Sequence, residues 1–135
     1  MGQQQLLLII LGVIVVGIAV AVGITMFQDN AVSANRDAVT NDLVNLAARA
    51  QQFYRRPSAL GGGAQSFLLL TADAAGLARL TSKPTNANGT YTISTAGTST
   101  EVVLTGIGVE KADGTNLIEM DMHVRADTTW IVVVY

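Results

Sequence analysis

Residues 6–24 read LLLIILGVIVVGIAVAVGI, nineteen consecutive positions without one polar side chain. About twenty apolar residues in a helix cross the hydrocarbon core of a bilayer, so the stretch predicts a helix of membrane length. The large side chains expected to form its apolar surface are Leu6, Leu7, Leu8, Ile9, Ile10, Leu11, Val13, Ile14, Val15, Val16, Ile18, Val20, Val22 and Ile24.

The helix is expected to continue beyond this stretch with a single narrow apolar face. Between residues 32 and 53, apolar residues recur seven apart, with a second member four positions on. This spacing is typical of one apolar stripe along a helix. The residues predicted to pack the stripe against the rest of the chain are Val32, Val39, Leu43, Leu46, Ala50 and Phe53. Arg36 stands at the stripe position where an apolar residue is missing.

The other faces of this second half are polar and are expected to face away from the stripe. They carry Asn35, Asp37, Asn41, Asp42, Asn45, Arg49 and Gln52. Arg55-Arg56-Pro57 is predicted to end the helix, because a proline pushes the preceding residue out of helical geometry. One helix over residues 6–54 would be about 75 Å long, more than a domain of this size buries. The chain therefore divides into an apolar helix (1–28), its amphipathic continuation (29–56) and a C-terminal part (57–135).

Two other interpretations of the apolar helix remain open. Ala19-Val20-Ala21 resembles the cleavage pattern of a secretory signal, although no Lys or Arg precedes the stretch and such signals usually have roughly 7–15 apolar residues. A passive single-pass anchor is the second, although Arg36 is the first basic residue and the usual basic flank is missing. Gly12, Gly17 and Gly23 do not have GxxxG spacing, and are either ordinary membrane-helix glycines or sites of close packing and unwinding.

Beyond residue 57 the chain begins with irregular structure. Ser58–Gly63 (SALGGG) predicts a flexible joint, and Ala72–Leu80 predicts a short helix or turn. Pro84–Gly89 (PTNANG) is rich in turn residues and predicts a turn.

A small antiparallel sheet is predicted for the remainder. Alternating residues indicate strands near 91–93, 101–109, 117–124 and 129–135, the second being either one strand bent at Gly106 or two strands. Asp113-Gly114 is a hairpin signal between two of them. Four strands joined by short turns form a meander, and the long helix is the one element available to cover a face of it. The fold class expected is α+β.

The composition argues against an enzyme. The net charge is −2, which provides no basic field for nucleic acid, and all charged residues lie beyond residue 28. There is no cysteine, which excludes disulfides and thiol chemistry. His123 is the one histidine and lies in an alternating strand, so a position on the sheet surface is expected. We expect no catalytic residues, no metal and no cofactor.

Three polar segments are candidates for minor sites. Asp113-Gly114-Thr115-Asn116, with the acidic residues that follow, has no recognisable calcium-loop spacing, and a hairpin turn is favoured. Asn88-Gly89-Thr90 is an N-x-T sequon on a predicted turn, which makes Asn88 a candidate for an N-linked glycan. Thr95–Thr100 is a candidate for O-linked sugar on an exposed loop.

An apolar N-terminal helix, its amphipathic extension, a loop and a small antiparallel sheet together resemble the type IV pilin superfamily. The resemblance covers the whole chain as architecture. Gln5 stands where pilins usually carry a glutamate, which is thought to pair with the terminal amine of a neighbouring subunit and set the register. The family's usual proline is replaced around Val22 and Gly23, and its terminal disulfide is absent. The resemblance implies two alternative processing frames: Met1 is the first mature residue, or the prepilin peptidase, which prefers a glycine before its cut, cleaves after Gly2 and leaves Gln3 as the first.

The resemblance implies a structural subunit of a pilus-like surface filament. Such subunits wait in the inner membrane and are extracted by an assembly platform and an ATPase, after processing by the peptidase. The apolar helices then form the core of an extracellular homopolymer. The alternatives are a minor pilin or pseudopilin of a secretion system, and a membrane-anchored β domain outside the cytoplasm. Outside lipid the apolar helix needs burial, which is worth about 25 cal/mol per Å².

Overall fold

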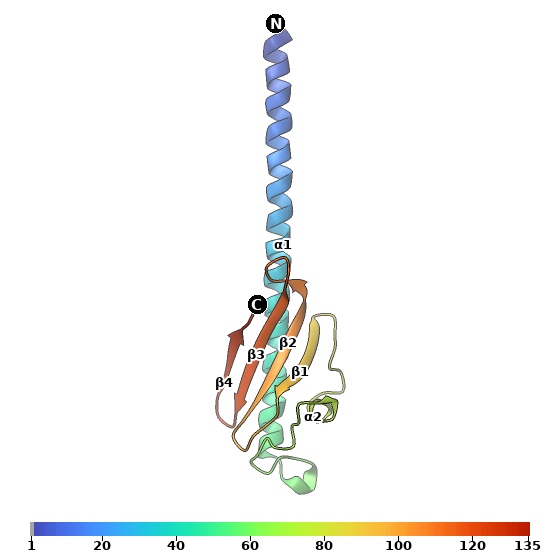
Figure 1. Cartoon of the computed structure of the whole chain (residues 1–135), viewed down its shortest axis with the longest axis vertical. Helices are drawn as coiled ribbons and strands as arrows, with labels where there is room; N and C mark the ends of the chain where they lie inside the picture. The colour runs from blue at the N-terminus through green and yellow to red at the C-terminus, as the bar shows by residue number, and fades with distance from the viewer. Residues whose placement is uncertain (1) are drawn as a thin grey trace.

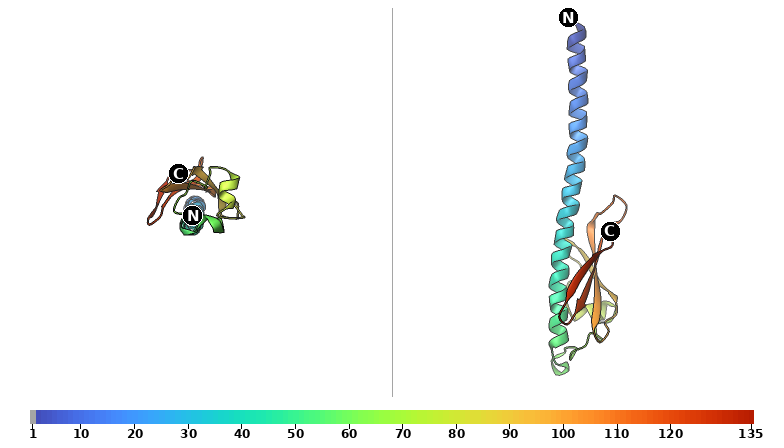
Figure 2. Two further views of the ribbon diagram at one scale, coloured as in Figure 1. Left: turned by 90° about the horizontal axis from the view of Figure 1, so that it is seen from below. Right: turned by 90° about the vertical axis from the view of Figure 1, so that its left-hand side faces the viewer.

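A computed structural model describes residues 2–135 and has the predicted α+β fold, with one long helix packed against one antiparallel sheet (Figure 1). The elements are α1 (Gly2–Arg55), the 3₁₀ turn η1 (Ser58–Leu60), α2 (Ala74–Ala78), β1 (Gly89–Thr95), β2 (Glu101–Lys111), β3 (Leu117–Arg125) and β4 (Thr129–Val133). The sheet lies on one side of the C-terminal half of α1, and the N-terminal half extends away from it (Figure 2). We call residues 57–135 the head.

α1 is one unbroken helix, as predicted. It contains no proline, and Gly12, Gly17 and Gly23 do not interrupt it. The helix ends at Arg55, two residues before Pro57. This agrees with the effect of a proline, which disfavours helical geometry at the residue before it. The exposed carbonyls of its last turn are then satisfied by the following loop.

The segment after α1 corrects the prediction of a flexible joint at Ser58–Gly63. The Gly63 amide donates to the Phe53 carbonyl at 2.8 Å, and the Gln65 amide donates to the Tyr54 carbonyl at 2.7 Å. Gly61 adopts φ 75°, a left-handed conformation that glycine tolerates. The segment is therefore a hydrogen-bonded cap on the helix end, where helices leave four carbonyls without partners.

The strands form a meander in the order β1-β2-β3-β4, with each neighbouring pair antiparallel. β2 is one continuous strand through Gly106, so the two-strand alternative is excluded. A Cβ atom at Gly106 would lie 2.8 Å from Val39 Cγ1 and 3.1 Å from Leu43 Cδ1. Glycine at this position therefore permits close contact between helix and sheet.

The predicted hairpin joins β2 to β3. The Asp113 carboxylate accepts hydrogen bonds from the amides of Thr115 (2.9 Å) and Asn116 (2.6 Å), and from Asn116 Nδ2 (3.0 Å). Gly114 has φ 81°. The Asp113 carboxylate therefore stabilises the turn, in agreement with the hairpin interpretation.

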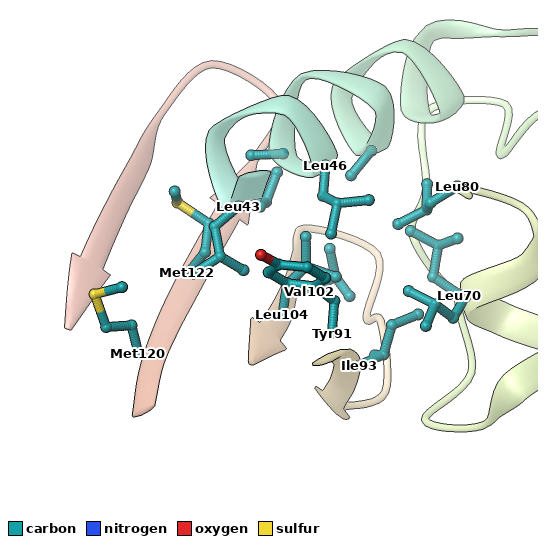
Figure 3. Close-up of a cluster of buried hydrophobic side chains, with 14 of the residues drawn as sticks. Leu43, Leu46, Leu70, Leu80, Tyr91, Ile93, Val102, Leu104, Met120 and Met122 are labelled. Carbon is teal, nitrogen blue, oxygen red and sulfur yellow. The ribbon is translucent and has the colours of Figure 1, made fainter. Parts of the chain in front are cut away.

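The hydrophobic core lies between α1 and the sheet (Figure 3). Leu43 and Leu46 point from the helix toward Tyr91, Leu104 and Met122 of the strands. Of the predicted packing stripe, Val39, Leu43, Leu46, Ala50 and Phe53 are buried. Val32 is only partly buried, because it lies near the point where the helix leaves the head.

Polar residues of α1, outside the predicted apolar stripe, also contact the head. Asn35 Nδ2 donates to the Asn88 carbonyl at 2.8 Å, and Asn35 Oδ1 accepts from the Val109 and Glu110 amides at 3.0 and 3.2 Å. Arg49 Nη1 donates to the Leu80 carbonyl at 3.1 Å.

Asp42 is the centre of a second polar contact. Its Oδ2 accepts from Tyr91 Oη at 2.6 Å, from Asn86 Nδ2 at 2.8 Å and from Asn88 Nδ2 at 2.9 Å. Burial alone would raise the pKa of Asp42, but the hydrogen bonds from Tyr91, Asn88 and Asn86 outweigh it and lower the pKa below its ordinary value of 3.8. Burial of the Tyr91 side chain, its hydrogen bond to Asp42 and the Asp42 charge raise the pKa of Tyr91 far above its usual range.

Asp42 should therefore contribute stability that is lost in acid. Because the folded-state pKa lies below the unfolded one, the contribution is full above about pH 5 and disappears as the pH falls through the folded-state value. Asp42→Asn should lower the free energy of unfolding by about 1–2 kcal/mol at pH 7. The difference from wild type should shrink below about pH 4, as measured by urea unfolding across pH.

The matched control is Asp37→Asn, which removes an exposed carboxylate that accepts no side-chain hydrogen bond within residues 2–135. Its unfolding curve should stay parallel to that of wild type over the same pH range. A constant difference between Asp42→Asn and wild type from pH 7 to pH 3 would contradict the assignment to Asp42.

Candidate functional site

The N-terminal half of α1 is a candidate site because it carries a large apolar surface that the chain itself does not cover. All fourteen large apolar residues predicted for this surface are exposed, by 51% at Val22 to 68% at Leu8 and Val13. Met26 and Phe27 continue the surface and are 61% and 76% exposed. We call residues 2–28 the bare helix.

The exposure of the bare helix is the same on every side. No residue from Gly2 to Asn30 is even partly buried, so no face is reserved for contact with the head. A helix that is apolar all round is normally buried in a protein or a membrane. Burying fourteen aliphatic side chains that are now mostly exposed is worth on the order of 20 kcal/mol. The bare helix therefore needs an apolar surrounding that one copy of the chain does not supply.

The bare helix has the length and composition of a membrane span. Among residues 2–135, α1 is the one helix long and apolar enough to cross a bilayer, and none of its most apolar window is buried. Beyond its first turn its amides are satisfied within the helix, and Thr25 Oγ1 donates to the Ala21 carbonyl at 3.1 Å. These properties suit lipid as well as a packed bundle of helices.

The N-terminal residues singled out for processing and register lie at the free end of the bare helix. Gly2 and Gln5 are exposed, and the Gln5 side chain makes no hydrogen bond within the described chain. Cβ atoms built at Gly12, Gly17 and Gly23 would meet nothing within 4 Å. Close packing at these glycines would have to come from another molecule.

The sequon residue Asn88 is engaged with the helix. Its Nδ2 atom, which would carry a glycan, donates to Asp42, and its carbonyl accepts from Asn35. A glycan on this nitrogen would have to be accommodated beside α1. Glycosylation at Asn88 therefore remains a prediction, and these two contacts stand against it.

His123 lies on the outer face of the sheet, as its alternating strand predicts. Its Nδ1 atom lies 2.8 Å from Glu101 Oε1, and its ring stacks on Trp130 with centroids 4.9 Å apart. Arg125 Nε donates to Glu101 Oε2 at 2.9 Å, and its guanidinium lies 5.1 Å from the Trp130 ring centroid. Hydrogen bonds to His123 and Arg125 lower the pKa of the Glu101 carboxyl. His123, Arg125 and Glu101 each have a side-chain partner, which suits a cross-strand contact.

A cavity of about 440 Å³ lies between α2 and β1. Its lining includes Leu77, Tyr91 and Ile93, and its one charged residue is Asp73. Asp73 already accepts hydrogen bonds from Thr71 Oγ1 at 2.6 Å and from the Gly76 amide at 2.7 Å, as the N-cap of α2. Within residues 2–135, no group of three His, Cys, Asp or Glu side chains is placed to hold a metal ion.

Sequence reasoning found the bare helix but missed the polar contacts of its continuation. Asn35, Asp42 and Arg49 are spaced seven apart, as the apolar stripe is, so they share one side of the helix. That common spacing was the available signal for a second inward-facing row.

Comparisons with known proteins identify no relative of this chain. No protein-family model matches the sequence, and neither a curated protein nor a solved structure matches it.

Proposed function

We propose that this chain is a structural subunit of a type IV pilus-like surface filament and assembles through its bare helix. The observation that carries the proposal is a helix whose first half is apolar and uncovered on all sides, while its second half is locked to a folded head. Such a molecule needs one apolar environment for the bare helix and water around the head.

Lipid and a bundle of helices would each bury the apolar surface of the bare helix. We expect the bare helix to occupy the two surroundings in turn. Before assembly the bare helix lies in the inner membrane with the head outside the cytoplasm. During assembly it exchanges lipid contacts for contacts with the bare helices of other copies, and the head stays on the filament surface. The first charged residue of the chain is Asp29, so a core built from bare helices holds no side-chain charge. The pilin resemblance implies a peptidase, an assembly platform and an ATPase as partners.

Electron microscopy of material sheared from cells that express the chain tests the proposal. Thin fibres labelled by an antibody to the head are expected, and should be absent from a deletion strain. The purified chain should also form assemblies when detergent is removed. Protein that stays monomeric and soluble without detergent would contradict the proposal. Protein retained in the membrane, with no fibres, would favour an anchored β domain.

A further inference from the structure

Asn88-Gly89 is the one Asn-Gly dipeptide of the chain, and it lies where β1 begins. Glycine has no side chain to shield its backbone nitrogen. In a flexible chain this nitrogen therefore reaches the carboxamide carbon of the preceding asparagine, and the asparagine deamidates spontaneously. How fast this position reacts depends on how firmly the fold holds its two residues.

Deamidation at this position needs only the dipeptide and water. The Gly89 backbone nitrogen bonds to Cγ of Asn88, the Cγ–Nδ2 bond breaks, and ammonia leaves with the proton of the Gly89 amide. One water molecule then opens the resulting succinimide ring. The product is either aspartate or isoaspartate, in which the main chain runs through the side-chain carbons. Both products carry a carboxylate in place of the neutral carboxamide.

The fold holds both reacting groups of the dipeptide. The leaving group, Asn88 Nδ2, donates to Asp42 Oδ2 at 2.9 Å, and the attacking Gly89 amide donates to Asn86 Oδ1 at 3.1 Å. The main chain is fixed as well, because the Asn88 amide donates to Asn86 Oδ1 at 2.9 Å and the Asn88 carbonyl accepts from Asn35 Nδ2 at 2.8 Å. Ring closure therefore requires this segment to open first.

The fold also explains why these two residues stand together. A Cβ atom at Gly89 would lie 2.2 Å from the Ile107 carbonyl oxygen, so the close approach of β1 to β2 needs a glycine. Asn88 Nδ2 is one of the donors that hold Asp42 of α1. The contact between strands needs the glycine and the contact with the helix needs the carboxamide, although the pair is reactive.

We propose that Asn88 is a deamidation site protected by the contact between α1 and the head, and that deamidation breaks this contact. In aspartate, the new carboxylate replaces an Nδ2 atom that lies 2.9 Å from Asp42 Oδ2. A hydrogen-bond donor is then exchanged for a like charge, which disfavours the contact. In isoaspartate, the carbonyl that accepts from Asn35 becomes the carboxylate, and the longer main chain displaces β1 against β2.

The consequence is that unfolding of the head becomes irreversible with time. While the head is docked on α1, the reaction waits for local opening of the segment. In an unfolded head the dipeptide reacts freely, so deamidation competes with refolding, and chains that react lose the Asp42 contact permanently. This inference concerns α1 and the head of one chain and does not depend on filament assembly.

Mass spectrometry of peptides from the full-length chain in mild detergent measures the protection. Native protein and protein whose head is unfolded by guanidinium are kept in the same mildly alkaline buffer, and deamidation of Asn88 is followed with time. Native wild type should react more slowly by about tenfold or more. Asp42→Ala should speed the reaction of the native protein by about tenfold, because it frees the leaving group.

The matched control is Asp37→Ala, which removes an exposed carboxylate of α1 and should leave the rate unchanged. Trp130 fluorescence confirms that each head stays folded during the incubation. Equal rates in native and unfolded wild type would overturn the proposed protection, and so would an unfolded chain that does not deamidate. A native Asp42→Ala variant that reacts no faster than Asp37→Ala would exclude the contact with α1 as its cause.

Asn88→Asp tests the consequence, because this substitution makes one of the two products directly. At neutral pH it should raise the equilibrium constant for unfolding of the head by about tenfold or more. Asn41→Asp adds the same charge at an exposed position of α1 and is the control. The exchange variant Asn88→Asp/Asp42→Asn swaps donor and acceptor, so it should recover much of the loss. Stability equal to the control, or no recovery on exchange, would overturn the proposed break.

Discussion

Val16→Asp should abolish filament formation while leaving the head folded. Val16 lies in the middle of the bare helix, 62% exposed in one copy and without any contact to the head. A carboxylate at the centre of a membrane helix costs about 2.5–3.5 kcal/mol. In the proposed filament the cost recurs at every subunit, since each helix would bring one unpaired charge into the core.

The measurement is the amount of sheared fibre seen by electron microscopy, with thermal unfolding in detergent as the check on the head. Val20→Asp should behave in the same way. Asn41→Asp is the matched control, because it adds the same charge at an exposed position beyond the bare helix and should leave assembly near normal. Normal fibres from Val16→Asp would show that the bare helix does not form the filament core.

Leu43→Ala should have the opposite effect, destabilising the head without changing the bare helix. Leu43 is fully buried, points toward the strands (Figure 3) and lies close to Gly106 of β2. Deleting a buried leucine side chain typically costs 2–5 kcal/mol, and we expect about 3 kcal/mol here because the helix and strands cannot close the gap. Small domains have about 5–15 kcal/mol of total stability, so much of the folded margin would be lost.

Urea unfolding of the full chain in mild detergent measures this loss. Trp130 is the one tryptophan and stacks on His123 in the sheet, so its fluorescence reports on the head. Val44→Ala is the matched control: the next residue is 50% exposed, and its truncation should cost no more than about 0.5 kcal/mol. Equal losses for the two variants would contradict the packing of α1 described above.

Several features of the molecule follow from short-range patterns in the sequence. The apolar stretch, the seven-residue stripe and Pro57 were enough to predict α1 and where it ends. Alternating residues and Asp113-Gly114 were enough to predict an antiparallel sheet with a hairpin between β2 and β3. These signals are local, because helix and strand periodicity and turn chemistry are set by residues within a few positions of one another.

The contacts that join helix to head required the tertiary structure. Asp42 meets Tyr91, 49 residues away, and Asn35 meets the β2 amides 74 and 75 residues away. A polar side chain on a helix is predicted to face solvent until a partner is placed against it, and that partner comes from a distant segment. The prediction of a flexible loop after α1 was wrong for a different, local reason: the loop amides bind the Phe53 and Tyr54 carbonyls at the end of α1, which have no partner within the helix.

The bare helix shows most clearly which properties the sequence determines and which ones only the tertiary structure decides. The sequence determined that residues 6–24 are helical, apolar and uncharged, since each property depends on side-chain type alone. Only the tertiary structure decided that the head leaves this surface open on every side. Burial depends on how distant segments pack, and here the packing ends near Val32, where the sheet no longer covers the helix.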